Sequence, residues 1–338
     1  MRQIWITKAG GPEVLEVREA PTPEPGAGEI RIRVKASGVN FADIMARMGQ
    51  YPDAPPIPCV VGYEVSGDVD AVGPGVTGFS QGDRVVSLTQ FNGYSDAVVV
   101  PAVYARRLPD QVTYEAAAAI PVNYCTAWIM LVRCGNIQAG ETALVHSAGG
   151  GVGLAALQIC QWRGAHVVGT ASAGKHARLT EMGVAHCIDY NTEDFEQEVM
   201  GYTQGQGVDI VLDAVGGRSF KKGYRCLAPL GRLFMFGVSS SAVGKRRSIA
   251  AIAKTLLTMP WFHPIPLIDK NRGVFGTNMG HLWDVMDKLG ADMDHILQLT
   301  AEGAFAPVVD ATFPFDQAGE AHAYIQDRKN FGKVLLTP

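Results

Sequence analysis

Apolar and polar residues follow two different patterns along this chain, and the change of pattern predicts two domains. Up to about residue 120, segments such as Ile30-Arg31-Ile32-Arg33-Val34 alternate apolar and charged residues between turns rich in Pro and Gly. From about 123 to 240, short apolar runs alternate with segments of helical periodicity. The chain is therefore expected to contain an all-β unit and a parallel sheet covered by helices.

The second region carries the strands of a doubly wound sheet. After a first strand at 142–145, we expect strands at Val167–Thr170, His186–Ile188, Val208–Leu212, Arg232–Gly237 and Val274–Thr277, with helical segments between them. His281–Glu302 reads as a helix. The last thirty or so residues return to short strands, which we expect to fold back onto the N-terminal domain. The predicted domains are 1–122 with 307–338, and 123–306.

A glycine-rich turn follows the first of these strands. Thr142-Ala143-Leu144-Val145 is apolar or small, and helical spacing begins at Val152. Glycine suits such a turn because a side chain would hold a pyrophosphate away from the backbone N–H groups at the helix start. The spacing departs from the strict motif, with Leu154 in the sixth position, and the alternative is a tight turn that only packs the helix closely. The predicted dinucleotide contacts here are Ala148, Gly149, Gly150, Gly151, Val152 and Gly153.

Composition and charge exclude several classes. The 338 residues suffice for about two domains. A formal net charge of −4 offers nucleic acid no electrostatic attraction. Six cysteines without a C-x-x-C pair argue against a disulfide framework and favour a reducing, cytoplasmic setting. The N-terminus runs directly into a strand-like segment, so no signal peptide is expected.

One apolar stretch, residues 249–268, has the length of a membrane span but is interrupted by Lys254, His263 and three prolines. A transmembrane segment is therefore not expected. A flap over the active site, a subunit contact and a membrane-surface helix remain open, and burial within the fold is the expectation.

The second strand identifies the dinucleotide. An NAD site normally closes this strand with an acid for the ribose 2′-hydroxyl, but here it ends Gly169-Thr170-Ala171-Ser172. Lys175, His176 and Arg178 follow, and cations beside a hydroxyl suit a 2′-phosphate. We therefore expect NADPH, with Ser172 and Lys175 at the phosphate. The alternative is that Lys175 and Arg178 only solvate an exposed helix face, and for Arg178 this is the preferred interpretation.

Several blocks together resemble the zinc-independent quinone oxidoreductase group of the medium-chain dehydrogenase/reductase superfamily. They are Asn40-Phe41-Ala42-Asp43 with Arg47, Gly49 and Tyr51, Gly62-Tyr63-Glu64-Val65-Ser66-Gly67, Gly82-Asp83-Arg84-Val85, Ala117-Ala118-Ala119-Ile120-Pro121, Thr126-Ala127-Trp128, the turn at 148–153 and Gly332-Lys333-Val334-Leu335-Leu336. Val122-Asn123-Tyr124 and Ile188-Asp189-Tyr190 are most similar to the vesicle-amine-transport-protein-like branch.

The resemblance implies a fold, a cofactor site and an assembly. The N-terminal domain would be a GroES-like, mainly β catalytic domain, beside a Rossmann domain that binds NADPH, and the protein would form a homodimer. Lys175 and Tyr190 fall where related reductases hold the 2′-phosphate. Further cofactor contacts are expected at Thr126, Phe236, Gly237, Ser239, Phe275, Thr277, Asn330, Gly332 and Lys333.

The zinc sites of the superfamily are not expected here. Tyr63 stands where zinc alcohol dehydrogenases have a histidine ligand, and phenol is a poor zinc ligand. No cysteine occurs between Cys59 and Cys125, so the structural zinc lobe has no ligands. We expect no metal.

Hydride transfer without zinc requires an acceptor that spreads the negative charge itself, such as a quinone or an α,β-unsaturated carbonyl. The candidate catalytic residues carried over from the family are Asn40, Asp43, Tyr51 and Tyr63, with Asn40 and Tyr51 ahead of the other two. Alternatively, Asn40 and Asp43 only cap a helix, and the tyrosines only pack. A second hypothesis is an NADPH-binding protein that works through a partner or a membrane surface.

Overall fold

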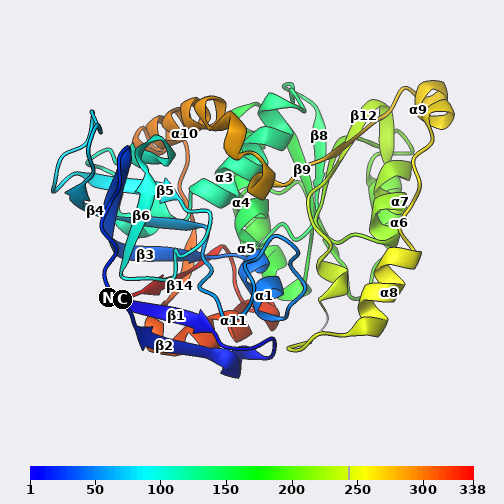
Figure 1. Cartoon of the computed structure of the whole chain (residues 1–338). Helices are drawn as coiled ribbons and strands as arrows, with labels where there is room; N and C mark the ends of the chain where they lie inside the picture. Colours follow the sequence, from blue (N-terminus) through cyan, green and yellow to red (C-terminus); the bar gives the residue numbers. More distant parts are fainter. Residues whose placement is uncertain (243) are drawn as a thin grey trace. The chain divides into compact units, whose positions relative to one another are not determined.

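The computed structural model describes residues 1–242 and 244–338, which form two units (Figure 1). The first contains 1–125, 244–247 and 279–338; the second contains the described part of 126–243 together with 248–278. Helix α3 (Pro121–Trp128) spans the boundary. The sequence-based division differs at three segments, because it places residues 123–125, 244–247 and 279–306 in the nucleotide-binding domain.

The first unit is built on a mainly antiparallel sheet of order β14-β15-β3-β4-β5-β7, with β6 also paired to β3 and a separate β1-β2 hairpin. Alternation explains β3: Ile30, Ile32 and Val34 are buried, while Arg31 and Arg33 point to the other face and pair with acids of β4. The strands are β1 (Arg2–Ile6), β2 (Leu15–Glu19), β3 (Glu29–Val39), β4 (Glu64–Val72), β5 (Arg84–Leu88), β6 (Ala97–Pro101), β7 (Ala105–Arg107), β14 (Val309–Pro314) and β15 (Lys333–Thr337).

The C-terminal strands return to this sheet, as the sequence predicts. β15 pairs antiparallel with β3 through Leu335 opposite Gly38, and β14 lies parallel to β15. The helices of the unit are α1 (Phe41–Arg47), α2 (Tyr114–Ala118), α10 (Met286–Ala301) and α11 (Ala318–Gln326).

The second unit holds a six-stranded parallel sheet of order β10-β9-β8-β11-β12-β13. This is the Rossmann order, in which the chain reverses its direction of winding between β8 and β11. The predicted fold class is confirmed. The strands are β8 (Thr142–Val145), β9 (His166–Ala171), β10 (His186–Asp189), β11 (Val208–Asp213), β12 (Leu227–Met235) and β13 (Gly273–Gly276).

Helices cover both faces of the parallel sheet, with α4 on one face and α6 and α7 on the other (Figure 1). Leu144, Val168 and Val211 are fully buried and pack with Phe220 of α7, so these strands are apolar because helices cover them. The helices are α4 (Gly151–Trp162), α5 (His176–Glu181), α6 (Phe195–Tyr202), α7 (Arg218–Arg225), α8 (Ile249–Leu257) and α9 (Pro264–Lys270).

The expectation that residues 249–268 are buried is wrong. They form α8 and α9, and Trp261 between them is 99% exposed. Leu257 of α8 and Ile268 of α9 are also largely exposed. Within the described residues no helix is long and apolar enough to cross a membrane. Two smaller differences concern boundaries: α10 begins at Met286 after two 3-10 turns, and β12 begins at Leu227.

Candidate active site

The glycine-rich turn joins β8 to α4 as predicted. Gly150 is the N-cap of α4 and supplies no side-chain cap, so the first N–H groups of the helix are not satisfied by a capping side chain. Such N–H groups bind phosphate well. A Cβ on Gly153 would lie 2.5 Å from the Ser147 carbonyl oxygen, so this glycine is needed because α4 packs tightly on the turn. The N–H groups at this helix start could hold a phosphate, and Gly153 serves the packing.

The ends of β9 and β10 bring together the residues expected at the 2′-phosphate. Ala171 pairs with Asp189, so Ser172 and Tyr190 follow at the same edge of the sheet. Ser172 is the N-cap residue of the short 3-10 turn Ala173–Lys175, without a side-chain cap hydrogen bond, and Lys175 ends this turn. β9 itself ends without an acid, which agrees with a site for a phosphate rather than a free ribose hydroxyl.

The remaining predicted contacts of this unit follow β11, β12 and β13. The backbone N–H of Phe236 donates to the Asp213 carbonyl (3.0 Å), that of Ser239 to the Ala214 carbonyl (2.9 Å), and that of Thr277 to the Met235 carbonyl (3.0 Å). A Cβ on Gly237 would lie 3.1 Å from the Ala214 carbonyl oxygen. Phe275 stacks on Phe234 with ring centroids 4.9 Å apart, and Thr126 is buried on α3.

His146 lies before the glycine turn and is a core residue. It is buried, its Nδ1 lies 3.1 Å from Thr170 Oγ1, and its ring packs edge-on against Phe195. Burial lowers the pKa of His146, so it is neutral at pH 7. Asp213 ends β11 and accepts from the backbone N–H groups of Val215 and Gly216, so it shapes the turn after this strand.

In the first unit, Asn40 and Asp43 form a capping box at the start of α1. Asp43 is fully buried and accepts from the backbone N–H groups of Asn40 (2.8 Å) and Gly62 (3.0 Å). Burial raises the pKa of Asp43 to about 7, although these N–H groups and Lys333 act against the shift. Asp43 therefore ties the turn before α1 to the segment that carries Tyr63.

The side chain of Asn40 is held by a buried ion pair. Lys333 Nζ donates to Asn40 Oδ1 (2.7 Å) and to Glu64, while Asn40 Nδ2 donates to Glu64 Oε1 (2.9 Å). The second carboxylate oxygen of Glu64 accepts from the backbone N–H of Val122. Lys333 and Glu64 are both buried, so each charge depends on the other. The orientation of the Asn40 amide is therefore fixed by its partners.

The two remaining residues expected near the cofactor precede Lys333. Asn330 Nδ2 donates to the carbonyl of Gly332 (3.0 Å), and Gly332 has a φ of 108°. A Cβ on Gly332 would approach the Val308 carbonyl oxygen to 2.5 Å. These contacts shape the turn that leads into β15.

Tyr63 and Tyr51 lie edge-on to one another, with ring centroids 6.1 Å apart, and Tyr63 also packs against Phe91. The Tyr63 hydroxyl is buried and has no hydrogen-bond partner within 1–242 and 244–338. Burial, with Asp43 nearby, raises the pKa of Tyr63, so the phenol keeps its proton. A buried hydroxyl without a partner costs about 1–3 kcal/mol, and a bound oxygen would remove that cost.

Two groups of residues were not identified from the sequence. Glu64 belongs to the family block Gly62–Gly67, and the one sequence signal for its role is a lone acid beside apolar residues at the start of β4. Tyr94 and His322 were missed entirely; the Tyr94 hydroxyl lies 3.0 Å from His322 Nε2, both buried, and they are 228 residues apart. Only the tertiary fold brings such pairs together.

Comparison with known proteins gives the family. Residues 26–110 match the alcohol dehydrogenase GroES-like domain, and residues 182–336 match a family described as zinc-binding dehydrogenase. The chain is 39% identical to the human synaptic vesicle membrane protein VAT-1 homolog, covering 100% of this chain and 86% of that protein. It is 34% identical to a quinone oxidoreductase of Pseudomonas aeruginosa, covering 100% and 99%.

The chain belongs to the medium-chain dehydrogenase/reductase superfamily. Escherichia coli quinone oxidoreductase, solved in complex with NADPH, has the same fold with a TM-score of 0.88 and 30% identity, covering 100% of both chains. The protein is an NADPH-dependent oxidoreductase of this superfamily, and the predicted cofactor is confirmed. Although one matching family is described as zinc-binding, no three His, Cys, Asp or Glu side chains among the described residues are grouped to hold a metal.

Proposed function

We propose that this protein reduces a quinone or an α,β-unsaturated carbonyl compound with NADPH. The observation that carries this proposal is the buried Tyr63 hydroxyl, which has no partner among the described residues. In the superfamily's zinc alcohol dehydrogenases a metal ligand stands at this position, according to the sequence resemblance. A protonated phenol there offers a hydrogen bond in place of a Lewis acid.

NADPH supplies a hydride when bound, and the protein has to stabilise the charge that develops on the acceptor oxygen. Tyr63 would donate its hydrogen bond to this oxygen, since its raised pKa keeps the phenol protonated. Tyr51 would form part of the apolar wall around the Tyr63 hydroxyl, because its ring lies edge-on to the Tyr63 ring. Quinones and enones suit such a site because their oxygen needs a hydrogen bond and no metal.

The other site residues are proposed in supporting roles. Asn40 is a weaker donor candidate than the sequence suggested, because Glu64 and Lys333 already engage both ends of its amide. Asp43 would position the Tyr63 segment through Gly62. We propose that NADPH contacts come from the turn at 148–153, from Thr126, Ser172, Lys175 and Tyr190, from Phe236, Gly237, Ser239, Phe275 and Thr277, and from Asn330, Gly332 and Lys333.

The acceptor and the donor are tested together by NADPH oxidation with a panel of quinones and enones. Tyr63→Phe should lower kcat by about 10²-fold on the best acceptor, the usual effect of losing one donor to a developing charge. Tyr51→Phe is the matched control and should change kcat by less than about threefold. If the wild type oxidises NADPH with no acceptor of the panel, the proposed substrate class is wrong. If Tyr63→Phe has the same kcat as the wild type, Tyr63 does not donate a hydrogen bond to the acceptor.

We further propose that the protein is a cytoplasmic homodimer. The exposed apolar side chains of α8, of α9 and of the segment between them, which contains Trp261, support a contact surface, because exposed patches of this kind usually mark contacts. The same observation favours the second candidate, a protein acting at a membrane surface. Light scattering after gel filtration and sedimentation with anionic liposomes separate the two candidates. A dimer that does not bind liposomes supports the cytoplasmic homodimer, and a monomer that sediments with liposomes supports action at a membrane surface.

A further inference from the structure

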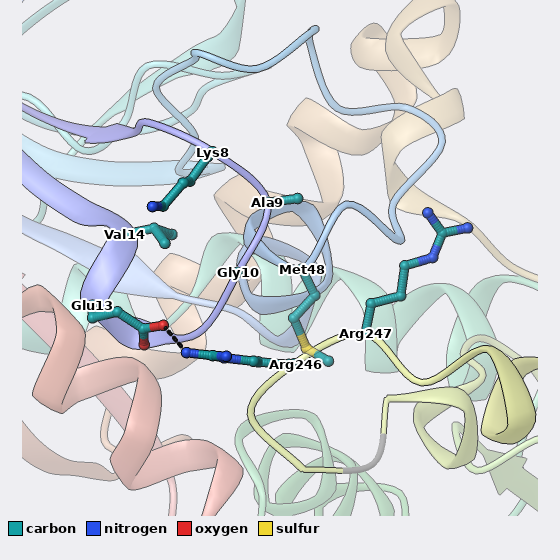
Figure 2. A pocket seen from close by; sticks show the side chains of 8 residues that line it. All are labelled: Lys8, Ala9, Gly10, Glu13, Val14, Met48, Arg246 and Arg247. Atoms are coloured by element: carbon teal, nitrogen blue, oxygen red, sulfur yellow. Dashed lines mark hydrogen bonds and ion pairs between the residues drawn. The ribbon is translucent and has the colours of Figure 1, made fainter.

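A cavity of about 600 Å³ lies in the first unit, between the loop after β1 and residues 244–247. Lys8, Glu13, Arg246 and Arg247 supply its charged lining, and Ala9, Gly10, Val14 and Met48 supply the rest (Figure 2). The proposed reductase chemistry uses none of these residues. The cavity is large enough for a small organic molecule.

The charge of this cavity is positive. Glu13 Oε1 accepts from Arg246 Nη2 at 2.9 Å, the contact drawn as a dashed line in Figure 2. Within the parts of the chain that the structure describes, neither Lys8 nor Arg247 is in an ion pair. The lining therefore contains three cations and one carboxylate, a formal charge of +2, and only Arg246 contacts the carboxylate. An anion would relieve the repulsion among these cations.

Both walls of the cavity are fixed by hydrogen bonds from buried Arg47. Its Nε donates to the Gly10 carbonyl (3.3 Å) and its Nη2 donates to the Lys245 carbonyl (3.4 Å). Gln326 of α11 donates to the carbonyl of Gly244 (2.9 Å), and Lys245 pairs with Asp327. The cationic segment 244–247 is thus held against the loop after β1 by specific contacts, and Arg47 adds a third unneutralised charge beside the cavity.

Arg47 also has an unused donor. Its Nη1 is buried and lacks a hydrogen-bond partner within the described residues. A buried arginine normally has all its donors satisfied, so this group is short of an acceptor. Arg47 contacts both walls without lining the cavity itself, so its positive charge adds to the potential that attracts an anion there.

We propose that this cavity binds a phosphate ester, with the phosphate on Lys8, Arg246 and Arg247 and the organic part on Val14 and Met48. The charge of a phosphate dianion, −2, matches the +2 charge of the lining. A single carboxylate would neutralise only half of that charge. Arginine forks suit its oxygens. The same chemistry is offered by a soluble metabolite and by a lipid headgroup.

Calorimetry with inorganic pyrophosphate tests the site, in excess NADPH so that the cofactor site is filled. The double variant Lys8→Ala, Arg247→Ala should raise the Kd about 100-fold, or about tenfold for each charge-assisted contact. Glu13→Gln should lower the Kd several-fold, because it removes the only acid of the lining. Arg18→Ala, at an exposed arginine paired with Glu16 in the same unit, is the matched control and should leave the Kd unchanged.

Sedimentation with phosphatidylcholine vesicles, with and without phosphatidic acid, identifies the source of the phosphate. Binding of pyrophosphate alone supports a soluble ester; binding of phosphatidic acid vesicles that the double variant loses supports a lipid headgroup. The proposal is overturned if the wild type binds neither ligand, or if the double variant binds as tightly as the wild type while keeping the wild-type melting temperature.

Discussion

The charged side chains around Asn40 are held in place by several buried hydrogen bonds. Asp43 binds the Asn40 backbone, and Lys333 and Glu64 bind the two ends of its amide. Lys333 can only donate, so the atom it contacts must be the amide oxygen, and the amide nitrogen then faces Glu64. Truncating one partner of the Glu64–Lys333 pair would leave an uncompensated buried charge. The position of the Asn40 amide therefore depends on both members of this pair.

Asp43 should make the unfolding free energy depend on pH. Its pKa is about 7 in the native state, above the unfolded value, so between about pH 4 and pH 7 the native state binds more protons. Stability from this group is greatest below the unfolded pKa and is lost as the pH rises through 7. Urea unfolding at pH 5 and pH 7.5 should show wild type losing a few kcal/mol over this interval, and Asp43→Asn losing much less.

Asp316→Asn is the control for this measurement, since Asp316 is an exposed acid paired with Arg2 in the same unit. It should follow the wild-type pH dependence. If Asp43→Asn also follows it, the buried carboxylate is already ionised at pH 5, and burial does not control its titration.

The sequence predicts the role of residues whose partners are near them in the chain. Asn40 and Asp43 are three residues apart, so their capping box could be predicted from spacing. Lys333 was expected at the cofactor, and its pairing with Glu64 could not be foreseen, because 269 residues separate them. The unpartnered Tyr63 hydroxyl could not be foreseen either, because it depends on every neighbour that surrounds the ring.

At the scale of the elements, the connection from β8 to α4 has a constrained backbone geometry. Ser147 has a φ of 55°, and the Gly153 position is closed to any side chain by the carbonyls of Ser147 and Ala148. The helix start is therefore pressed onto the turn, which keeps the first N–H groups of α4 in one place for a phosphate.

Gly153→Ala should destabilise the protein by about 1–3 kcal/mol and weaken NADPH binding, because the turn has to move to admit the methyl group. Gly201→Ala in α6 is the matched control: a Cβ at this position would have no neighbour within 4 Å, and alanine favours helices. Thermal unfolding and NADPH fluorescence titration measure both effects. Wild-type NADPH affinity in Gly153→Ala would show that the turn does not hold the cofactor.

Helices α8 and α9 show where reasoning from periodicity fails at this scale. Their apolar composition predicts that these helices are buried. Composition does not show, however, whether the same chain or another molecule buries them. The strands were predicted more accurately, because parallel strands buried on both faces must be apolar throughout.

At the scale of the whole molecule, each unit is built on a sheet of a different type, mainly antiparallel in the first unit and parallel in the second. The parallel sheet and its helices follow from the alternation of elements along the chain, and this part could be predicted from the sequence. The assignment of 279–306 could not, because it depends on contacts such as Arg106 with Gly290 and Asp294, and Tyr124 with Phe305, within the first unit. Hydrophobic periodicity contains no information about such partners.

The most direct test of the account compares NADPH and NADH oxidation by wild type, Lys175→Ala and Arg178→Ala with the best acceptor of the panel. We expect wild type to prefer NADPH, and Lys175→Ala to raise the KM for NADPH by about tenfold, the cost of one charge-assisted contact, with the KM for NADH unchanged. Arg178→Ala should behave as wild type. An equal rise for both cofactors, or no rise for either, would contradict a 2′-phosphate site at Lys175.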